Sequence, residues 1–144
     1  MPHTSYASRI IKATTAQIWP LIADFNGLPK IHPAITASEL EQGASETAVG
    51  VIRKITLPDG FVRERLVKLD VDNHELHYAI VDGIMPVTDY VAVVKLTQKE
   101  DGTTLAEWWA DFNVTEGQDL QEVAQNVSEG VFATCLQHIA QHVA

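Results

Sequence analysis

The 144-residue chain has little positive charge, one cysteine and no long apolar run. Ten Lys and Arg against nineteen Asp and Glu give a net charge of −9, which repels phosphate backbones, so we expect no nucleic-acid partner. The single cysteine, Cys135, excludes an intrachain disulfide and a multi-cysteine metal site. A stretch of about 18 apolar residues is also missing, so the sequence predicts no membrane span.

Motifs for phosphate, cofactor or metal binding are missing as well. His138 and His142 have a spacing that can bind zinc, but no third ligand lies near them in the sequence, and we expect neither a metal nor a cofactor. Residues 1–5 have neither the basic nor the apolar region of a signal peptide. Together with the lone cysteine, this predicts a cytoplasmic protein.

The rest of the composition is typical of a globular protein. The chain is 46% hydrophobic and 20% charged, with a mean hydropathy near zero. A chain of this length buries roughly 70% of its unfolded surface, enough for one core. We therefore expect a single domain over residues 1–144, as a monomer or weak homodimer.

Capping and turn signals divide the chain into a strand, two short helices, six strands and a long helix. Residues 5–13 are typical of a strand, and a capping box over Thr14 to Gln17 begins a helix that Pro20 should kink or shorten. A short helix or turn follows through residues 30–31. Turn signals then separate six strand-like runs between residues 35 and 114, which predicts an antiparallel meander. These signals are Gln42-Gly43, Pro58-Asp59-Gly60, Asp72-Asn73, Asp82-Gly83 and Asp101-Gly102.

The last segment has helical periodicity. A second capping box is predicted over Thr115 to Gln118, and apolar residues recur at helical spacing from Leu120 to Val143. Their broad stripe is typical of a helix that lies across a curved sheet. Gly130, in the middle, should cost about 1 kcal/mol relative to Ala. It indicates either close backbone packing or room for a ligand beneath the helix.

This order of elements and several short segments resemble the polyketide cyclase/dehydrase branch of the START-related helix-grip (SRPBCC) superfamily. The segments are AQIWPLIADF (16–25), LPKIHP (28–33), VGVIR (49–53), DG (59–60) and EWWADF (107–112). The resemblance implies an α+β helix-grip fold: a curved seven-stranded antiparallel sheet wrapped around a long C-terminal helix, with two short helices after the first strand. It also implies an internal cavity for a hydrophobic or amphipathic molecule.

Arg53 and Glu64 are the predicted polar groups of that cavity. If Asp59-Gly60 is a two-residue hairpin turn, position 55 pairs with 64 and 53 with 66, so Arg53 and Glu64 are diagonal neighbours on one face. Apolar residues share this face and mark it as inward: Val49, Val51, Ile55, Leu57, Val62 and Leu66. Arg53 then binds a ligand oxygen or carboxylate while Glu64 holds its guanidinium. The alternatives are a purely structural ion pair and a register shift that turns both side chains to solvent.

Aromatic residues supply the rest of the predicted site. In residues 106–112, strand alternation places Trp108 and Phe112 on one apolar face with two alanines, and Trp109 on the opposite, mixed face. Trp108 is therefore predicted to lie in the packed core or in the cavity wall. Tyr78 and Tyr90 can add hydroxyls, although the pattern leaves their faces open. The predicted ligand-binding residues are Arg53, Glu64, Tyr78, Tyr90, Trp108 and Phe112.

Three functions fit the sequence, and no catalytic set is recognisable. The favoured one is binding or carrying a small hydrophobic or aromatic molecule. A cyclase or dehydratase acting on a polyketide-like or other enolisable substrate is the second, with Glu64 or His32 moving protons and Arg53 stabilising an enolate. His32, near the predicted cavity mouth, is otherwise a gate or a solvated loop residue. The third is a protein-interaction module, by analogy with relatives that activate a chaperone ATPase.

Overall fold

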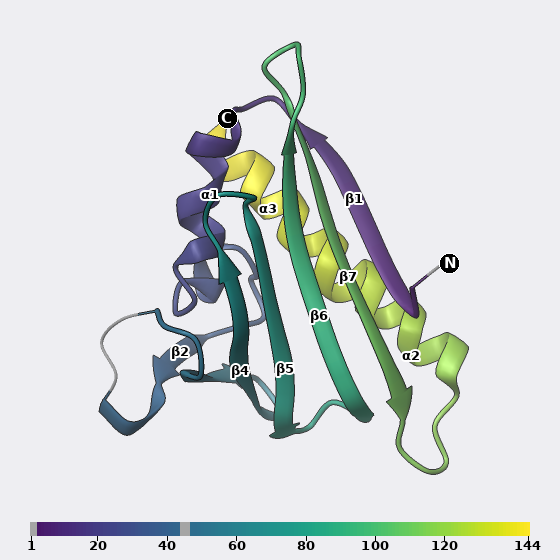
Figure 1. The fold of residues 1–144 in the computed structure, drawn as a ribbon. Helices are drawn as coiled ribbons and strands as arrows, with labels where there is room; N and C mark the ends of the chain where they lie inside the picture. The colour runs from purple at the N-terminus through teal and green to yellow at the C-terminus, as the bar shows by residue number, and fades with distance from the viewer. Residues whose placement is uncertain (1–2, 44–46) are drawn as a thin grey trace.

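A computed structural model describes residues 3–43 and 47–144. Seven strands of this part of the chain form one antiparallel sheet in the order β1-β7-β6-β5-β4-β3-β2. The strands are β1 (Ser5–Ile11), β2 (Ala37–Leu40), β3 (Ile52–Leu57), β4 (Gly60–Asp70), β5 (Glu75–Gly83), β6 (Val87–Gln98) and β7 (Thr104–Val114). A long C-terminal helix crosses one face of the curved sheet, with the N-terminal helix on the same side (Figure 1). The α+β helix-grip architecture is confirmed.

The first helix, α1 (Thr15–Ala23), begins where the sequence predicts it. The Thr14 hydroxyl accepts the Gln17 backbone N–H at 3.3 Å, and the Gln17 side chain accepts the Thr14 N–H at 2.9 Å, which completes the capping box. Pro20 lies inside this short helix. α1 packs against β6 and the end of the C-terminal helix, and a single 3₁₀ turn, η1 (Leu28–Lys30), follows. A second 3₁₀ turn, η2 (Glu41–Gly43), follows β2.

The β3–β4 hairpin differs in register from the prediction. Leu57 pairs with Gly60 and Arg53 pairs directly with Glu64, so the turn is Pro58-Asp59 and the predicted pairing is wrong by two residues. Proline favours the first central position of a turn because its φ is fixed. Since a shift of two residues keeps every side chain on its face, the inward orientation of Arg53 and Glu64 is nevertheless confirmed. Val49 precedes β3 and is 64% exposed, so its predicted inward position is wrong.

The C-terminal helix begins later than predicted. Residues 115–118 form a turn in which the Gln118 N–H bonds to the Thr115 carbonyl, and Gly117 has a φ of +85°. The second predicted capping box is therefore wrong, because a left-handed residue interrupts the helical backbone there. Asp119 caps the helix instead, and its carboxylate accepts the backbone N–H of Gln121 at 3.0 Å.

This helix has three parts: α2 (Leu120–Asn126), a π-helical segment η3 (Val127–Ala133) and α3 (Thr134–Val143). A π turn holds one residue more than an α turn, so the backbone bulges. Two carbonyls of the bulge accept side-chain donors, since the Thr134 hydroxyl donates to the Glu129 oxygen at 3.1 Å and His32 bonds to the Gly130 oxygen at 2.8 Å. A Cβ added at Gly130 would meet nothing within 4 Å, so close backbone packing does not explain this glycine.

The buried side chains between sheet and helices form one cluster. In β7, Trp108 is 3% exposed and faces this cluster with Phe112. Trp109 lies on the opposite face, where its ring stacks on His3 with centroids 5.0 Å apart. The predicted inward and outward faces of this strand are therefore confirmed. None of the helices in residues 3–43 and 47–144 is long and apolar enough to cross a membrane.

Candidate functional site

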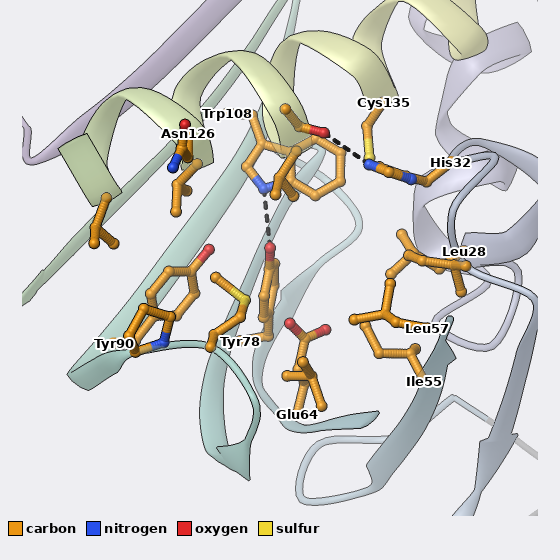
Figure 2. A pocket seen from close by; sticks show the side chains of 18 of the residues that line it. Leu28, His32, Ile55, Leu57, Glu64, Tyr78, Tyr90, Trp108, Asn126 and Cys135 are labelled. Atoms are coloured by element: carbon orange, nitrogen blue, oxygen red, sulfur yellow. Dashed lines mark hydrogen bonds between the residues drawn. The ribbon is translucent and has the colours of Figure 1, made fainter. Parts of the chain in front are cut away.

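A cavity of about 380 Å³ lies between the sheet and the C-terminal helix (Figure 2). The sheet contributes Ile55, Leu57, Val62, Glu64, Tyr78, Tyr90 and Trp108 to its wall. The C-terminal helix contributes Glu122, Val123, Asn126, Val127, Gly130, Val131 and Cys135. Loops and η1 contribute Leu28, His32, Ile35, Met85, Pro86 and Gln118. An apolar wall with a few polar groups is the usual composition of a small-molecule site.

Arg53 lies behind the cavity wall. Its Nε donates to Glu64 Oε1 at 2.8 Å, Nη2 lies 2.7 Å from the same oxygen, and Nη1 donates to the Phe25 carbonyl at 2.8 Å. The guanidinium carbon is 3.9 Å from the Phe25 ring centre and 4.9 Å from that of Tyr78. Arg53 is only 4% exposed and does not line the cavity. The ion pair predicted from the sequence is therefore formed, with Glu64 as its cavity-facing member.

Glu64 presents one carboxylate oxygen to the cavity. Both Arg53 contacts end on Oε1, and Oε2 accepts no hydrogen bond from the described residues. No buried side-chain oxygen or nitrogen in the described part of the chain lacks a partner, so Oε2 is not a sealed, unsatisfied atom. Because Glu64 lines the cavity, this oxygen is accessible from it.

Tyr78 and Tyr90, whose faces the sequence left open, both line the cavity. The Tyr78 hydroxyl accepts a hydrogen bond from Trp108 Nε1 at 3.1 Å. Burial is the main cause that raises the pKa of each tyrosine hydroxyl well above its ordinary value. Both hydroxyls therefore keep their protons at neutral pH and remain hydrogen-bond donors.

Trp108 and Phe112 have different positions relative to the cavity. Trp108 lines it and stacks on Phe132 of η3, with ring centroids 5.5 Å apart. Phe112 is not part of the wall but packs behind Tyr90, with centroids 5.3 Å apart. Of the six predicted ligand-binding residues, the structure thus brings four to the cavity and places Arg53 and Phe112 behind it.

His32 forms part of the cavity wall and contacts the C-terminal helix. The Ala34 backbone N–H donates to His32 Nδ1 at 3.1 Å, so in the neutral ring Nε2 carries the hydrogen and donates to the Gly130 carbonyl. This contact joins the loop after η1 to the π bulge. His32 is thus a wall residue rather than a freely solvated loop residue.

On the helical side of the wall, the sequence pointed only to Gly130, for which room for a ligand was one of two interpretations, and no helical residue was among the predicted ligand-binding residues. Val123, Val127 and Val131 recur every four residues, and Cys135 continues this row. Their small size beside Gly130 is the sequence signal that indicates the free space. Cys135 is buried, and burial raises the pKa of its thiol to about 12, so it is an inert wall residue rather than a nucleophile.

Comparison with known proteins gives consistent matches over nearly the whole chain. Residues 2–144 match the sequence profile of a family described as "Polyketide cyclase / dehydrase and lipid transport". The major pollen allergen Car b 1 isoform 2 of Carpinus betulus is 25% identical over 156 residues, covering 94% of this chain and 90% of the allergen. XoxI from Bacillus cereus is 28% identical with a TM-score of 0.83, covering 96% of this chain and 94% of XoxI. A Thermobifida fusca protein also has a TM-score of 0.83 at 28% identity, covering 96% and 91%.

Proposed function

The chain belongs to the polyketide cyclase/dehydrase and lipid transport family, and on that premise we propose that it binds and carries a small hydrophobic or amphipathic molecule in its internal cavity. The observation that carries the proposal is the cavity of about 380 Å³ beside a core whose other end holds a void of only about 10 Å³. Protein interiors are close-packed, and an unfilled space gives up dispersion contacts with every wall residue. A bound apolar molecule restores those contacts.

The polar groups support binding more strongly than catalysis. An enzyme acting through an enolate needs a positive or hydrogen-bonding group at the developing oxyanion. Arg53 does not suit that role, because each of its three nitrogens already contacts Glu64 or the Phe25 carbonyl and its faces lie against Phe25 and Tyr78. Glu64 with two protonated phenols suffices to orient a guest.

Native mass spectrometry of the purified protein tests the proposal. We expect an adduct of constant mass that is lost on denaturation, together with saturable binding of the neutral fluorescent probe N-phenyl-1-naphthylamine. Val127→Phe should abolish the adduct and probe binding, because the larger side chain fills the cavity from the helix. It should also lower the free energy of unfolding by about 1–3 kcal/mol. Val67→Phe is the matched control, since Val67 is on the outer face and 46% exposed.

Chemical analysis of the bound molecule addresses the enzymatic alternative. A carrier releases its guest chemically unchanged, so chromatography of the eluted molecule before and after incubation should give one species. Conversion that stops in Glu64→Gln would support a reaction with Glu64 as general base. The carrier proposal fails if neither an adduct nor probe binding is detected.

A further inference from the structure

The acidic and basic side chains of the cavity wall are two carboxylates and one histidine, His32, whose ring nitrogens both contact backbone atoms. Among the described lining residues, the carboxylates are Glu64 and Glu122, and no lysine or arginine takes part. The nearest buried cation, Arg53, is held by Glu64 Oε1 and the Phe25 carbonyl and lies between two aromatic rings. A ligand carboxylate would therefore meet negative charge without a cation to contact, in surroundings where charges are poorly screened.

The uncharged polar groups near Glu64 are complementary to it. Figure 2 shows the Glu64 carboxylate and the Tyr78 and Tyr90 hydroxyls pointing into the same cavity. Glu64 Oε2 can only accept a hydrogen bond, whereas a protonated phenol can also donate one. Tyr78 already accepts from Trp108, so its own hydrogen remains to be donated. A guest hydroxyl can donate to Oε2 and accept from a tyrosine at the same time.

We propose that the cavity selects apolar molecules whose polar end is a hydrogen-bond donor, an alcohol, phenol or amine, with Glu64 Oε2 as acceptor, and rejects the matching carboxylates. The inference rests on the proposed ligand-binding function and specifies the ligand class of that site. It also replaces the expectation that Arg53 binds a ligand carboxylate. The donor satisfies Glu64 Oε2, the oxygen of this carboxylate that Arg53 does not contact.

A matched set of naphthalenes tests this selectivity: 2-naphthylmethanol, 2-naphthylmethylamine and 2-naphthoate. Each competes with N-phenyl-1-naphthylamine for the full-length protein at neutral pH and physiological salt. The alcohol and the amine should bind at least about tenfold more tightly than the carboxylate, since only the carboxylate places like charges together. Raising the salt concentration should leave the preference for the alcohol in place, because a buried contact is weakly screened.

Substitutions test whether Glu64 causes the preference for the alcohol over the carboxylate. Glu64→Gln should reduce the preference for alcohol over carboxylate to within about threefold. The double variant Arg53→Met with Glu64→Gln serves if the single variant does not fold, because it leaves no stranded charge. Glu116→Gln, which removes an exposed carboxylate outside the cavity wall, is the control and should leave the ratio unchanged.

The outcomes separate the two proposals. Equal binding of the three compounds, tighter binding of 2-naphthoate, or no competition by any of them while the probe still binds would each overturn the selectivity and leave the carrier function standing. An unchanged ratio in Glu64→Gln would also overturn it. Failure of the probe itself to bind would remove the proposed function, and the inference with it.

Discussion

At the α1 end of the interior, side chains fill the space between sheet and helix, whereas at the other end the same two layers enclose the cavity of about 380 Å³. The residual void beside Arg53 at the filled end is about 10 Å³. Here α1 and the loop after it insert large side chains, among them Ile18, Ile22 and Phe25. At the open end, the helix presents valines and Gly130.

Leu28, Tyr78 and Trp108 line both voids, and Tyr78 and Trp108 form the aromatic part of the partition between them. Their hydrogen bond fixes the two rings edge to face, with centroids 6.4 Å apart. The comparison indicates that one core can be tightly packed for stability at one end and left open for a ligand at the other. Substitutions should therefore affect mainly stability at the filled end and mainly binding at the open end.

The largest effect is expected at the Arg53–Glu64 pair. Removing either charge leaves the other buried and unpaired, and each single substitution should lower the free energy of unfolding by about 3–5 kcal/mol. Arg53→Met with Glu64→Gln should lower it by less than the sum of the single changes. Urea denaturation of the four proteins measures the coupling. Additive losses would mean that the two charges do not depend on each other.

Trp108→Ala tests the partition. A tryptophan packed on all sides would lose roughly 3–5 kcal/mol on truncation, and Trp108 should lose less because it already borders the cavity. Binding of N-phenyl-1-naphthylamine should weaken, since the variant removes the stacked wall and the donor to Tyr78. Trp109→Ala, on the outer face, should change probe binding little. The reverse pattern would contradict the assigned faces.

Alkaline pH probes the buried thiol at the open end. The pKa of Cys135 is about 12 in the folded protein against 9.0 for the free thiol, so the unfolded chain loses its proton first. The stability that the protonated thiol provides is fully present below pH 9 and is lost towards pH 12, at roughly 1 kcal/mol per pH unit. Cys135→Ala should make the fall in stability between pH 9 and pH 12 less steep. The two buried tyrosines still contribute to the pH dependence of both proteins. Identical alkaline slopes would contradict a buried thiol.

The smallest effect is expected for His32→Ala. Losing one hydrogen bond to the Gly130 carbonyl should lower stability by about 1 kcal/mol or less. The probe should associate and dissociate faster, because the loop is no longer attached to the helix, while its equilibrium affinity changes little. Stopped-flow fluorescence measures both rates. Unchanged rates would show that this end of the cavity is not the ligand's route.

Local periodicity predicted the inward faces of β3, β4 and β7 correctly, although Val49, just before β3, is exposed. The face of Arg53 and Glu64 survived an error of two residues in register, because only odd shifts exchange the faces of a strand. Tyr78 and Tyr90 were harder to assign. Register shifts occur between Leu66 and Lys68 and between Thr88 and Val91. The inward and outward alternation of one strand therefore cannot be carried over to the next.

Local sequence pattern could not predict which inward-facing side chains reach the cavity. Arg53 is excluded from the cavity by the Phe25 ring and carbonyl, which lie 28 positions earlier in the chain. The start of the last helix was missed because Thr115 to Gln118 fits a capping box, although Gly117 adopts a left-handed conformation. Whether an inward face meets another side chain or empty space depends on segments that the fold brings together.

The π bulge lies over the cavity, so we expect a one-residue change in chain length here to alter the size of the cavity. The extra residue of the bulge leaves the two ends of the helix aligned. The buried face of α2 continues in α3 through Cys135 and Ile139. A one-residue deletion at this point would return the π turn to an α turn and should leave the core on either side in place. Deleting Gly130 should straighten the helix and shrink the cavity while the filled end remains intact. Lineages that differ by one residue here would differ in the molecules they admit.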